Sequence, residues 1–193
     1  RAQREQARRG RGEVERTLKM VDGVMLLVDA SEGPLPQTRF VLRKAFEANL
    51  TPIVVINKID RPDARINEVV NEVYDLFIDL DASEEQLDFP IIYASGLHGL
   101  AGPEPDQLAQ DMAPLLDLII ERVPSPPVED GPFQMQICAL DYSSYVGVIG
   151  IGRIRRGLVR PGMQVAVLDA DGSRRNGRIL TVLGHMGMEK QEM

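Results

Sequence analysis

Apolar runs alternate with amphipathic stretches over the first two thirds of the chain. Three continuous apolar runs predict strands that are covered on both faces. They lie at residues 24–28, 52–56 and 90–94. Three amphipathic stretches predict helices, at residues 37–49, 67–80 and 108–123. Strands that alternate with helices indicate an α/β fold with a doubly wound parallel sheet, and such sheets bind ligands at the carboxyl ends of their strands.

Beyond residue 132 the pattern is that of β-strands alone. Four strands are expected, at residues 133–139, 146–155, 164–168 and 173–182. Asp171 and Gly172 form a hairpin turn signal. Several short strands with glycine-rich turns predict a small β-barrel. No clear final strand precedes Met193, which leaves open whether the barrel closes without further residues.

The two patterns divide the chain into predicted domains. Residues 1–11 are rich in Arg and Gln and have no apolar face, so a disordered basic arm is expected there. Residues 12–123 carry the alternating strands and helices. Residues 124–132 are rich in proline and predict a stiff linker. Residues 133–193 carry the predicted barrel.

Composition narrows the classes of function. The chain has 193 residues, of which 44% are hydrophobic, and a formal net charge of −7. A general nucleic-acid binder would usually be basic, so DNA is not an expected partner. Cys138 is the single cysteine, and His98 and His185 show no ligand spacing, so no metal site is expected in this chain. No apolar run is long enough to span a bilayer, so we expect a soluble, cytoplasmic protein without a membrane partner.

Residues 57–60 read N-K-I-D and directly follow the second predicted strand. A carboxylate such as that of Asp60 can accept hydrogen bonds from both the ring N–H and the exocyclic amine of guanine, an edge that adenine lacks. The Asn57 amide can tie loops together, and the Lys58 stem can lie along the purine face. A wrong base would leave these groups unpaired. A guanine-binding loop is predicted, and the alternative is a polar turn capped by Asp63.

A second loop, Ser95-Gly96-Leu97, follows the third predicted strand. It resembles the short S-A-type loop of GTPases, whose backbone N–H meets the O6 atom of guanine. Gly96 suits this position, because close approach of a backbone favours a small residue. Ser95-Gly96 by itself is equally consistent with an ordinary turn. Both loops lie at the carboxyl ends of predicted strands and in the right order, and together they indicate a guanine pocket.

Longer stretches of sequence point to one family. They include G-E-V-E-R at residues 12–16, V-D-A-S-E-G-P-L-P-Q-T-R at residues 28–39, N-K-I-D-R-P at residues 57–62 and G-P-F-Q-M-Q at residues 131–136. These stretches resemble the translational GTPases of the elongation-factor class, and most closely the TypA/BipA family. The resemblance covers residues 12–193. It implies the C-terminal part of a P-loop-GTPase-like domain, followed by an elongation-factor-like barrel. It also implies a ribosome-associated protein that binds GTP or GDP and hydrolyses GTP when complete.

The segments with which GTPases hold phosphate do not occur in these 193 residues. There is no G-x-x-x-x-G-K-[ST] loop, so the phosphate-cradling backbone and its lysine are missing. The family's Asp-x-Pro-Gly-His segment, which touches magnesium and positions the attacking water, is replaced by E-Q-A-R-R-G-R at residues 5–11. Phosphoryl transfer is mostly positioning and charge neutralisation. We therefore expect no catalytic residue in this chain, no GTP hydrolysis by it alone, and Mg²⁺ only with the missing segments; the simplest account is a fragment.

Four arginines surround one predicted strand and turn of the barrel, namely Arg153, Arg155, Arg156 and Arg160. In translational GTPases this part of the barrel faces small-subunit ribosomal RNA, so the resemblance implies contacts to RNA phosphates. The alternative is a solvated edge strand guarded by charge. Two other functions stay open. One is a non-catalytic guanine-nucleotide or ribosome-binding module that lost its phosphate site, and the other is a piece of another elongation-factor-type GTPase.

Overall fold

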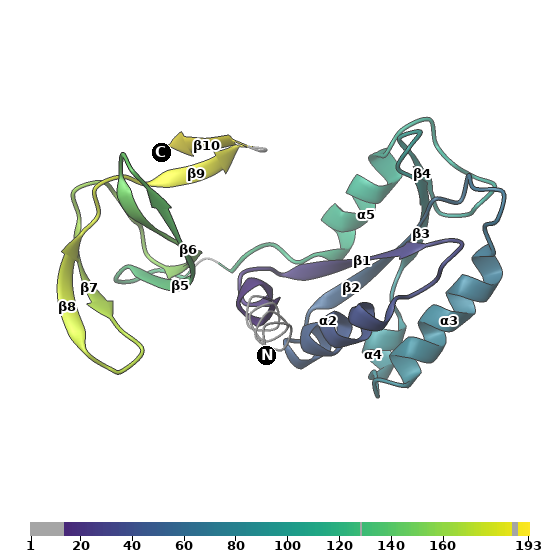
Figure 1. The fold of residues 1–193 in the computed structure, drawn as a ribbon, viewed down its shortest axis with the longest axis horizontal. Helices are drawn as coiled ribbons and strands as arrows, with labels where there is room; N and C mark the ends of the chain where they lie inside the picture. The colour runs from purple at the N-terminus through teal and green to yellow at the C-terminus, as the bar shows by residue number, and fades with distance from the viewer. Residues whose placement is uncertain (1–13, 128, 187–188) are drawn as a thin grey trace. The chain divides into compact units, whose positions relative to one another are not determined.

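The computed structural model describes residues 14–127, 129–186 and 189–193 (Figure 1). The chain divides into two compact units, Arg1–Pro126 and Pro127–Met193. The division falls within the proline-rich stretch at residues 124–132. The basic arm expected at residues 1–11 lies outside the described residues.

The first unit is built on a four-stranded sheet with the order β1-β2-β3-β4. The strands are β1 (Gly23–Asp29), β2 (Thr51–Asn57), β3 (Ile91–Ser95) and β4 (Leu100–Gly102). The first three run parallel, and β4 pairs antiparallel with β3. Asp29 lies opposite Asn57, and Asn57 lies opposite Ala94. The carboxyl ends of the three parallel strands therefore meet at one edge of the sheet.

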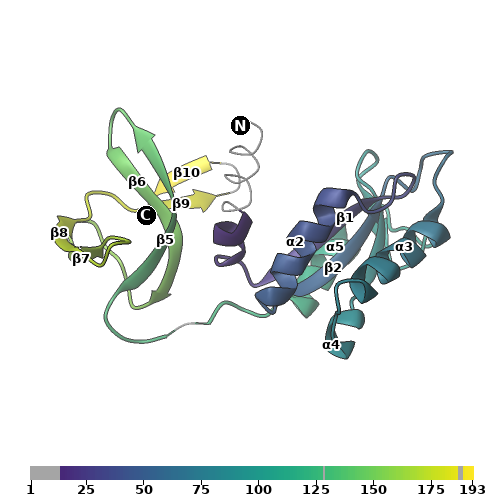
Figure 2. The same ribbon diagram turned by 60° about the horizontal axis from the view of Figure 1, so that its bottom comes forward.

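Helices cover both faces of this sheet (Figure 2). After a short helical segment at residues 14–18, they are α2 (Pro36–Glu47), α3 (Ile66–Ile78), α4 (Glu84–Leu87) and α5 (Ala113–Arg122). On one face Leu42 of α2 and Phe77 of α3 share a buried cluster with Val54 of β2. On the other face Leu115 of α5 packs with Ile53. Neighbouring strand residues thus bury opposite sides of β2, which explains its continuous apolar run.

The last helix begins later than the sequence pattern predicts. Residues 108–112 were expected to be helical, but α5 starts at Ala113. The backbone of this segment bonds to β4 instead, because the N–H of Ala109 donates to the carbonyl of Ala101 at 2.9 Å, and the N–H of Ala101 donates to that of Asp111 at 3.0 Å. The carboxylate of Asp111 then accepts the N–H of Ala113 and caps the start of the helix.

The second unit contains three antiparallel ribbons among its described residues. They pair β5 (Gln134–Ser143) with β6 (Gly147–Arg156), β7 (Gln164–Leu168) with β8 (Arg174–Arg178), and β9 (Leu183–Met186) with β10 (Glu189–Glu192). The turn between β7 and β8 passes through Gly172, which has a φ of 84°. The described pairings do not join the ribbons into one continuous sheet, and a closed barrel stays a prediction.

Two expectations for the end of the chain were wrong. The strand expected at residues 173–182 ends at Arg178, because the backbone of Ile179 turns to bond with Gly162 and Met163. A final hairpin, β9–β10, was not expected at all. Its second strand reads E-K-Q-E and is exposed at every residue, so it carries no apolar alternation to reveal it.

Arg65, directly before α3, fixes the loop that joins β1 to α2. Its guanidinium donates to the carbonyls of Ser31 at 2.8 Å and Glu32 at 3.2 Å. The same group pairs with the carboxylate of Glu72 on α3. Gly33 has a φ of 77°, and a Cβ there would collide with the Glu72 carboxylate, so this position requires glycine. The loop is thereby held against α3.

Replacing Arg65 by alanine should destabilise the first unit. The Arg65→Ala change leaves two loop carbonyls and Glu72 without their donor, and the melting temperature of this unit should fall by about 3–6 °C. Arg39→Ala is the matched control, because Arg39 also pairs through both terminal nitrogens with one carboxylate, that of Asp79, but the pair is exposed. It should lower the melting temperature by about 2 °C or less. Equal effects in calorimetry would contradict the role given to Arg65.

Limited proteolysis should separate the two units. An extended, proline-rich connection offers a protease more accessible backbone than the strands and helices on either side. We expect the first cleavages within residues 124–132 or in the first 11 residues, followed by a resistant product that begins near residue 12. Mass spectrometry of the early products checks this, and first cleavage inside residues 53–123 would contradict it.

Candidate functional site

Polar side chains gather where the three parallel strands end. Asp29 ends β1, Asn57 ends β2 and Ser95 ends β3. The strands before them are apolar, so these are the first side chains that can offer hydrogen bonds at this edge. The edge is also where open α/β sheets bind their ligands. The structure therefore brings together the two loops that were predicted to bind guanine.

Asn57 connects these two loops directly. Its Oδ1 atom accepts the N–H of Gly96 at 2.9 Å. The N–H of Ile59 donates to the carbonyl of Ala94 at 3.4 Å and adds a second link. The Gly96 N–H, which was expected to meet guanine O6, is thus engaged by Asn57 here. A Cβ on Gly96 would lie 3.5 Å from Oδ1 of Asn57, at ordinary contact distance, so alanine would also fit.

Asp60 and Ser95 form the polar centre of the two loops. Ser95 is 1% exposed, whereas the Asp60 side chain is 26% exposed. The hydrogen bond from the Ser95 hydroxyl holds the pKa of Asp60 below its ordinary value. Asp60 is therefore an ionised acceptor at neutral pH, with a carboxylate that a ligand can reach. Leu97 next to it is 83% exposed and offers an apolar surface at the rim.

Lys58 reaches toward the end of β1. Its Nζ atom lies 2.7 Å from Oδ2 of Asp29. Asp29 also accepts the N–H and the hydroxyl of Ser31, both at 2.8 Å, and the N–H of Glu32 at 3.3 Å. These donors, Lys58 above all, hold the pKa of Asp29 far below its usual range. The Lys58 side chain therefore links the loop after β2 to the end of β1.

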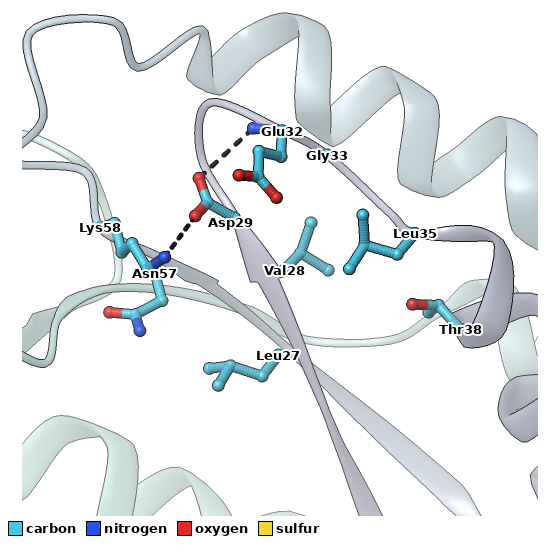
Figure 3. Close-up of a pocket in the computed structure, with 9 residues that line it drawn as sticks. All are labelled: Leu27, Val28, Asp29, Glu32, Gly33, Leu35, Thr38, Asn57 and Lys58. Atoms are coloured by element: carbon cyan, nitrogen blue, oxygen red, sulfur yellow. Dashed lines mark hydrogen bonds and ion pairs between the residues drawn. The ribbon is translucent and has the colours of Figure 1, made fainter.

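A pocket of about 200 Å³ opens beside this lysine (Figure 3). Its floor is apolar, with Leu27, Val28 and Leu35, and the Asp29–Lys58 pair lies at its rim. Of the predicted guanine-binding residues, Asn57 and Lys58 line it, whereas those of the Ser95 loop do not. The pocket thus adjoins the loop after β2 at Asn57 and Lys58 and does not extend to the loop after β3.

Three residues of this site were not predicted. Asp29 was given no role, although its position directly after the predicted strand at residues 24–28, like that of Asn57 after the next strand, was a usable signal. Arg61 lies 3.6 Å from Asp29 and pairs with Asp63 at 2.9 Å. His98 was set aside for lack of metal-ligand spacing, yet its Nδ1 atom lies 2.9 Å from Oγ of Ser95. Its position three residues after Ser95, in the same turn, could have revealed it.

The four arginines proposed to contact RNA lie on β6 and the turn after it. Arg155, Arg156 and Arg160 are exposed, and Arg153 is half-buried. Arg155 donates to Oε1 of Gln136 on β5 at 3.3 Å. The structure thus presents guanidinium groups along one end of the β5–β6 ribbon.

The described residues contain no group of three His, Cys, Asp or Glu side chains that could hold a metal ion. The acidic side chains around residues 79–88 are spread from the end of α3, where Asp79 pairs with Arg39, across a turn and along α4. Within the same part of the chain, no helix has both the length and the apolar character needed to cross a membrane.

Comparison with known proteins agrees with this geometry. Residues 11–125 match the family model described as the elongation factor Tu GTP binding domain. Over 182 residues, 94% of this chain, it is 60% identical to the large ribosomal subunit assembly factor BipA of Escherichia coli K12 and to that of Haemophilus influenzae. It is 52% identical to the Bacillus subtilis protein of the same name over 184 residues. The chain spans about 30% of the length of these relatives.

The relatives confirm the TypA/BipA resemblance that was read from the sequence, and the family model covers the strands and loops of the candidate site. The chain belongs to the family of the elongation factor Tu GTP binding domain.

Proposed function

We propose that the first unit supplies the guanine-recognition part of a nucleotide site in a ribosome-associated translational GTPase. The whole protein would bind GTP and GDP and hydrolyse GTP. The observation that carries this proposal is the joined pair of loops, in which the Asn57–Gly96 bond holds the Asp60 carboxylate beside the Ser95 hydroxyl. An ionised, reachable acceptor at this edge is complementary to the two donors of guanine.

We propose that the sugar and phosphates of the nucleotide extend from the guanine loops toward the pocket beside Lys58. It adjoins the guanine loops at Asn57 and Lys58, and it carries the ion pair of Lys58 with Asp29. Residues 1–193 contain no phosphate-cradling glycine-rich loop, and the described residues contain no group of three His, Cys, Asp or Glu side chains that could hold a metal ion. We therefore propose that phosphate, Mg²⁺ and the attacking water are handled outside the residues described, and we assign no catalytic residue within them.

The proposed role of the second unit is to contact ribosomal RNA through Arg153, Arg155, Arg156 and Arg160. Its charge supports this role, because residues 127–193 hold eight Lys and Arg against seven Asp and Glu, whereas the whole chain is acidic. Exposed guanidinium groups suit phosphate oxygens. The relatives are named for assembly of the large ribosomal subunit, and contact with small-subunit RNA is the expectation drawn from the family resemblance. We further propose that the three ribbons belong to a barrel, and that helices on both faces make the first unit doubly wound.

Asp60→Asn should change the base preference of the site. The amide places a donor against the donors of guanine, whereas xanthine has an oxygen where guanine has an amine. Affinity for GDP should fall about ten- to hundredfold, and xanthosine diphosphate should bind better than GDP. Titration of the 193-residue chain, followed through the amide NMR signals of residues 57–60 and 95–98, measures weak binding directly.

The matched control for this experiment is Asp63→Asn. Asp63 is an exposed carboxylate three residues away that pairs with Arg61. Its replacement should leave the preference for GDP over xanthosine diphosphate unchanged. If Asp60→Asn keeps the wild-type preference, the assignment of the guanine site is wrong.

The 193-residue chain should bind GDP weakly and should not turn GTP over. Most nucleotide affinity in such folds comes from backbone N–H groups and a lysine around the phosphates, and no such loop occurs in this sequence. A phosphate-release assay should give the same background rate for the wild type and Asp60→Asn. Fusing the corresponding amino-terminal segment of the Escherichia coli relative ahead of residue 12 should raise the rate. Clear turnover by residues 1–193 that Asp60→Asn abolishes would contradict the proposal.

A further inference from the structure

We propose that His98 is a positioning residue of the guanine site, and that protonation of its imidazole weakens guanine binding. This inference rests on the proposed function, because it treats Asp60 as the acceptor of the guanine donors. His98 acts on that acceptor through the hydroxyl of Ser95, which lies between them. The resulting site would bind guanine nucleotides more tightly at neutral pH than in mild acid.

The turn between β3 and β4 places His98 within reach of both partners. Its Nδ1 atom lies 2.9 Å from Oγ of Ser95 and 3.9 Å from Oδ2 of Asp60. The backbone N–H of His98 donates to the Ser95 carbonyl at 3.2 Å and lies 3.4 Å from Oγ. Backbone and side chain thus both tie His98 to Ser95. The imidazole side chain is 55% exposed, so water reaches its free side.

The donors and acceptors available on His98, Ser95 and Asp60 fix the direction of the hydrogen bonds between them. An ionised carboxylate can only accept, so the Ser95 hydroxyl must donate its single hydrogen to Asp60 to lower the pKa of that group. The hydroxyl oxygen then serves His98 as an acceptor, and Nδ1 must carry a hydrogen. This chain of hydrogen bonds therefore runs from the donor His98 through the Ser95 hydroxyl to the acceptor Asp60. Bonds in such a chain polarise one another, so a donor on His98 strengthens the hold of Ser95 on Asp60.

Protonation of the His98 imidazole adds a positive charge at the donor end of this chain of hydrogen bonds. The charged groups that act on Asp60 are His98 and Arg61. Arg61 is always charged and also pairs with Asp63 and Asp29, whereas histidine is the side chain that gains charge between pH 8 and pH 5. A charged imidazole beside Asp60 forms an ion pair with the carboxylate and competes with the two guanine donors. Guanine affinity should therefore decrease as the pH falls through this range.

Two substitutions separate the hydrogen bond from the charge. Asparagine can place its amide N–H near the position of Nδ1 but does not titrate, whereas alanine removes the donor altogether. At pH 7.5, His98→Ala should weaken GDP binding to the 193-residue chain about three- to tenfold, and His98→Asn should stay within about twofold of the wild type. From pH 7.5 to 5.5, the wild type should lose about threefold more affinity than His98→Asn. Comparison with His98→Asn cancels the titration of the GDP phosphates.

The outcomes separate the failure of this inference from that of the guanine site. If Asp60→Asn alters base preference while the wild type and His98→Asn have parallel pH profiles, the role of His98 is wrong and the guanine site stands. If His98→Ala binds GDP as the wild type does at pH 7.5, the positioning role is also wrong. If Asp60→Asn leaves base preference unchanged, the proposed function itself fails. Unchanged amide signals outside residues 57–60 and 95–98 establish that each variant is folded.

Discussion

The hydrogen bond between the Asn57 side chain and the Gly96 backbone is the interaction on which the candidate site depends. Parallel pairing brings the ends of β2 and β3 together, but it leaves the loops beyond them free to diverge. One amide, half-buried at the end of an apolar strand, closes that gap at 2.9 Å. Asp60, Ser95 and His98 can then form one continuous set of contacts, although almost 40 residues separate the two loops.

A second layer of contacts supports the neighbouring strand end. Asp29 forms an ion pair with Lys58 and accepts two backbone N–H groups of the turn that follows it. Arg65, directly before α3, donates to the carbonyls of the same turn. In the turn after β1, the N–H groups of Ser31 and Glu32 thus donate to the Asp29 side chain, and the carbonyls of the same two residues accept from Arg65. Lys58 links the two layers, because its backbone belongs to the guanine loop and its ammonium group to Asp29.

The sequence predicted the parts of this fold that apolar patterning controls. The three parallel strands and the helix at residues 67–80 appear almost where expected, because each buries an apolar face. The expectation that all three strands are covered on both faces was wrong for β1, which lies at the edge of the described sheet and leaves Met25 and Leu27 55% and 65% exposed. The start of α5 and the β9–β10 hairpin were missed, since backbone pairing rather than apolar periodicity determines them. The motif at residues 57–60 located the site, but it could not show that Lys58 reaches Asp29 or that His98 meets Ser95. Those contacts depend on which loops the sheet places side by side.

Lys58 adopts a left-handed backbone conformation, with a φ of 63°. A residue with a Cβ atom loses roughly 1–2 kcal/mol in that region relative to the right-handed one. Its neighbours impose the conformation, through the Asn57–Gly96 bond on one side and the Asp29 carboxylate on the other. The strain is therefore offset during folding, by contacts within the protein. If the proposed function holds, a base that enters between these loops meets a lysine whose backbone is already set and loses little of its binding energy to ordering the loop.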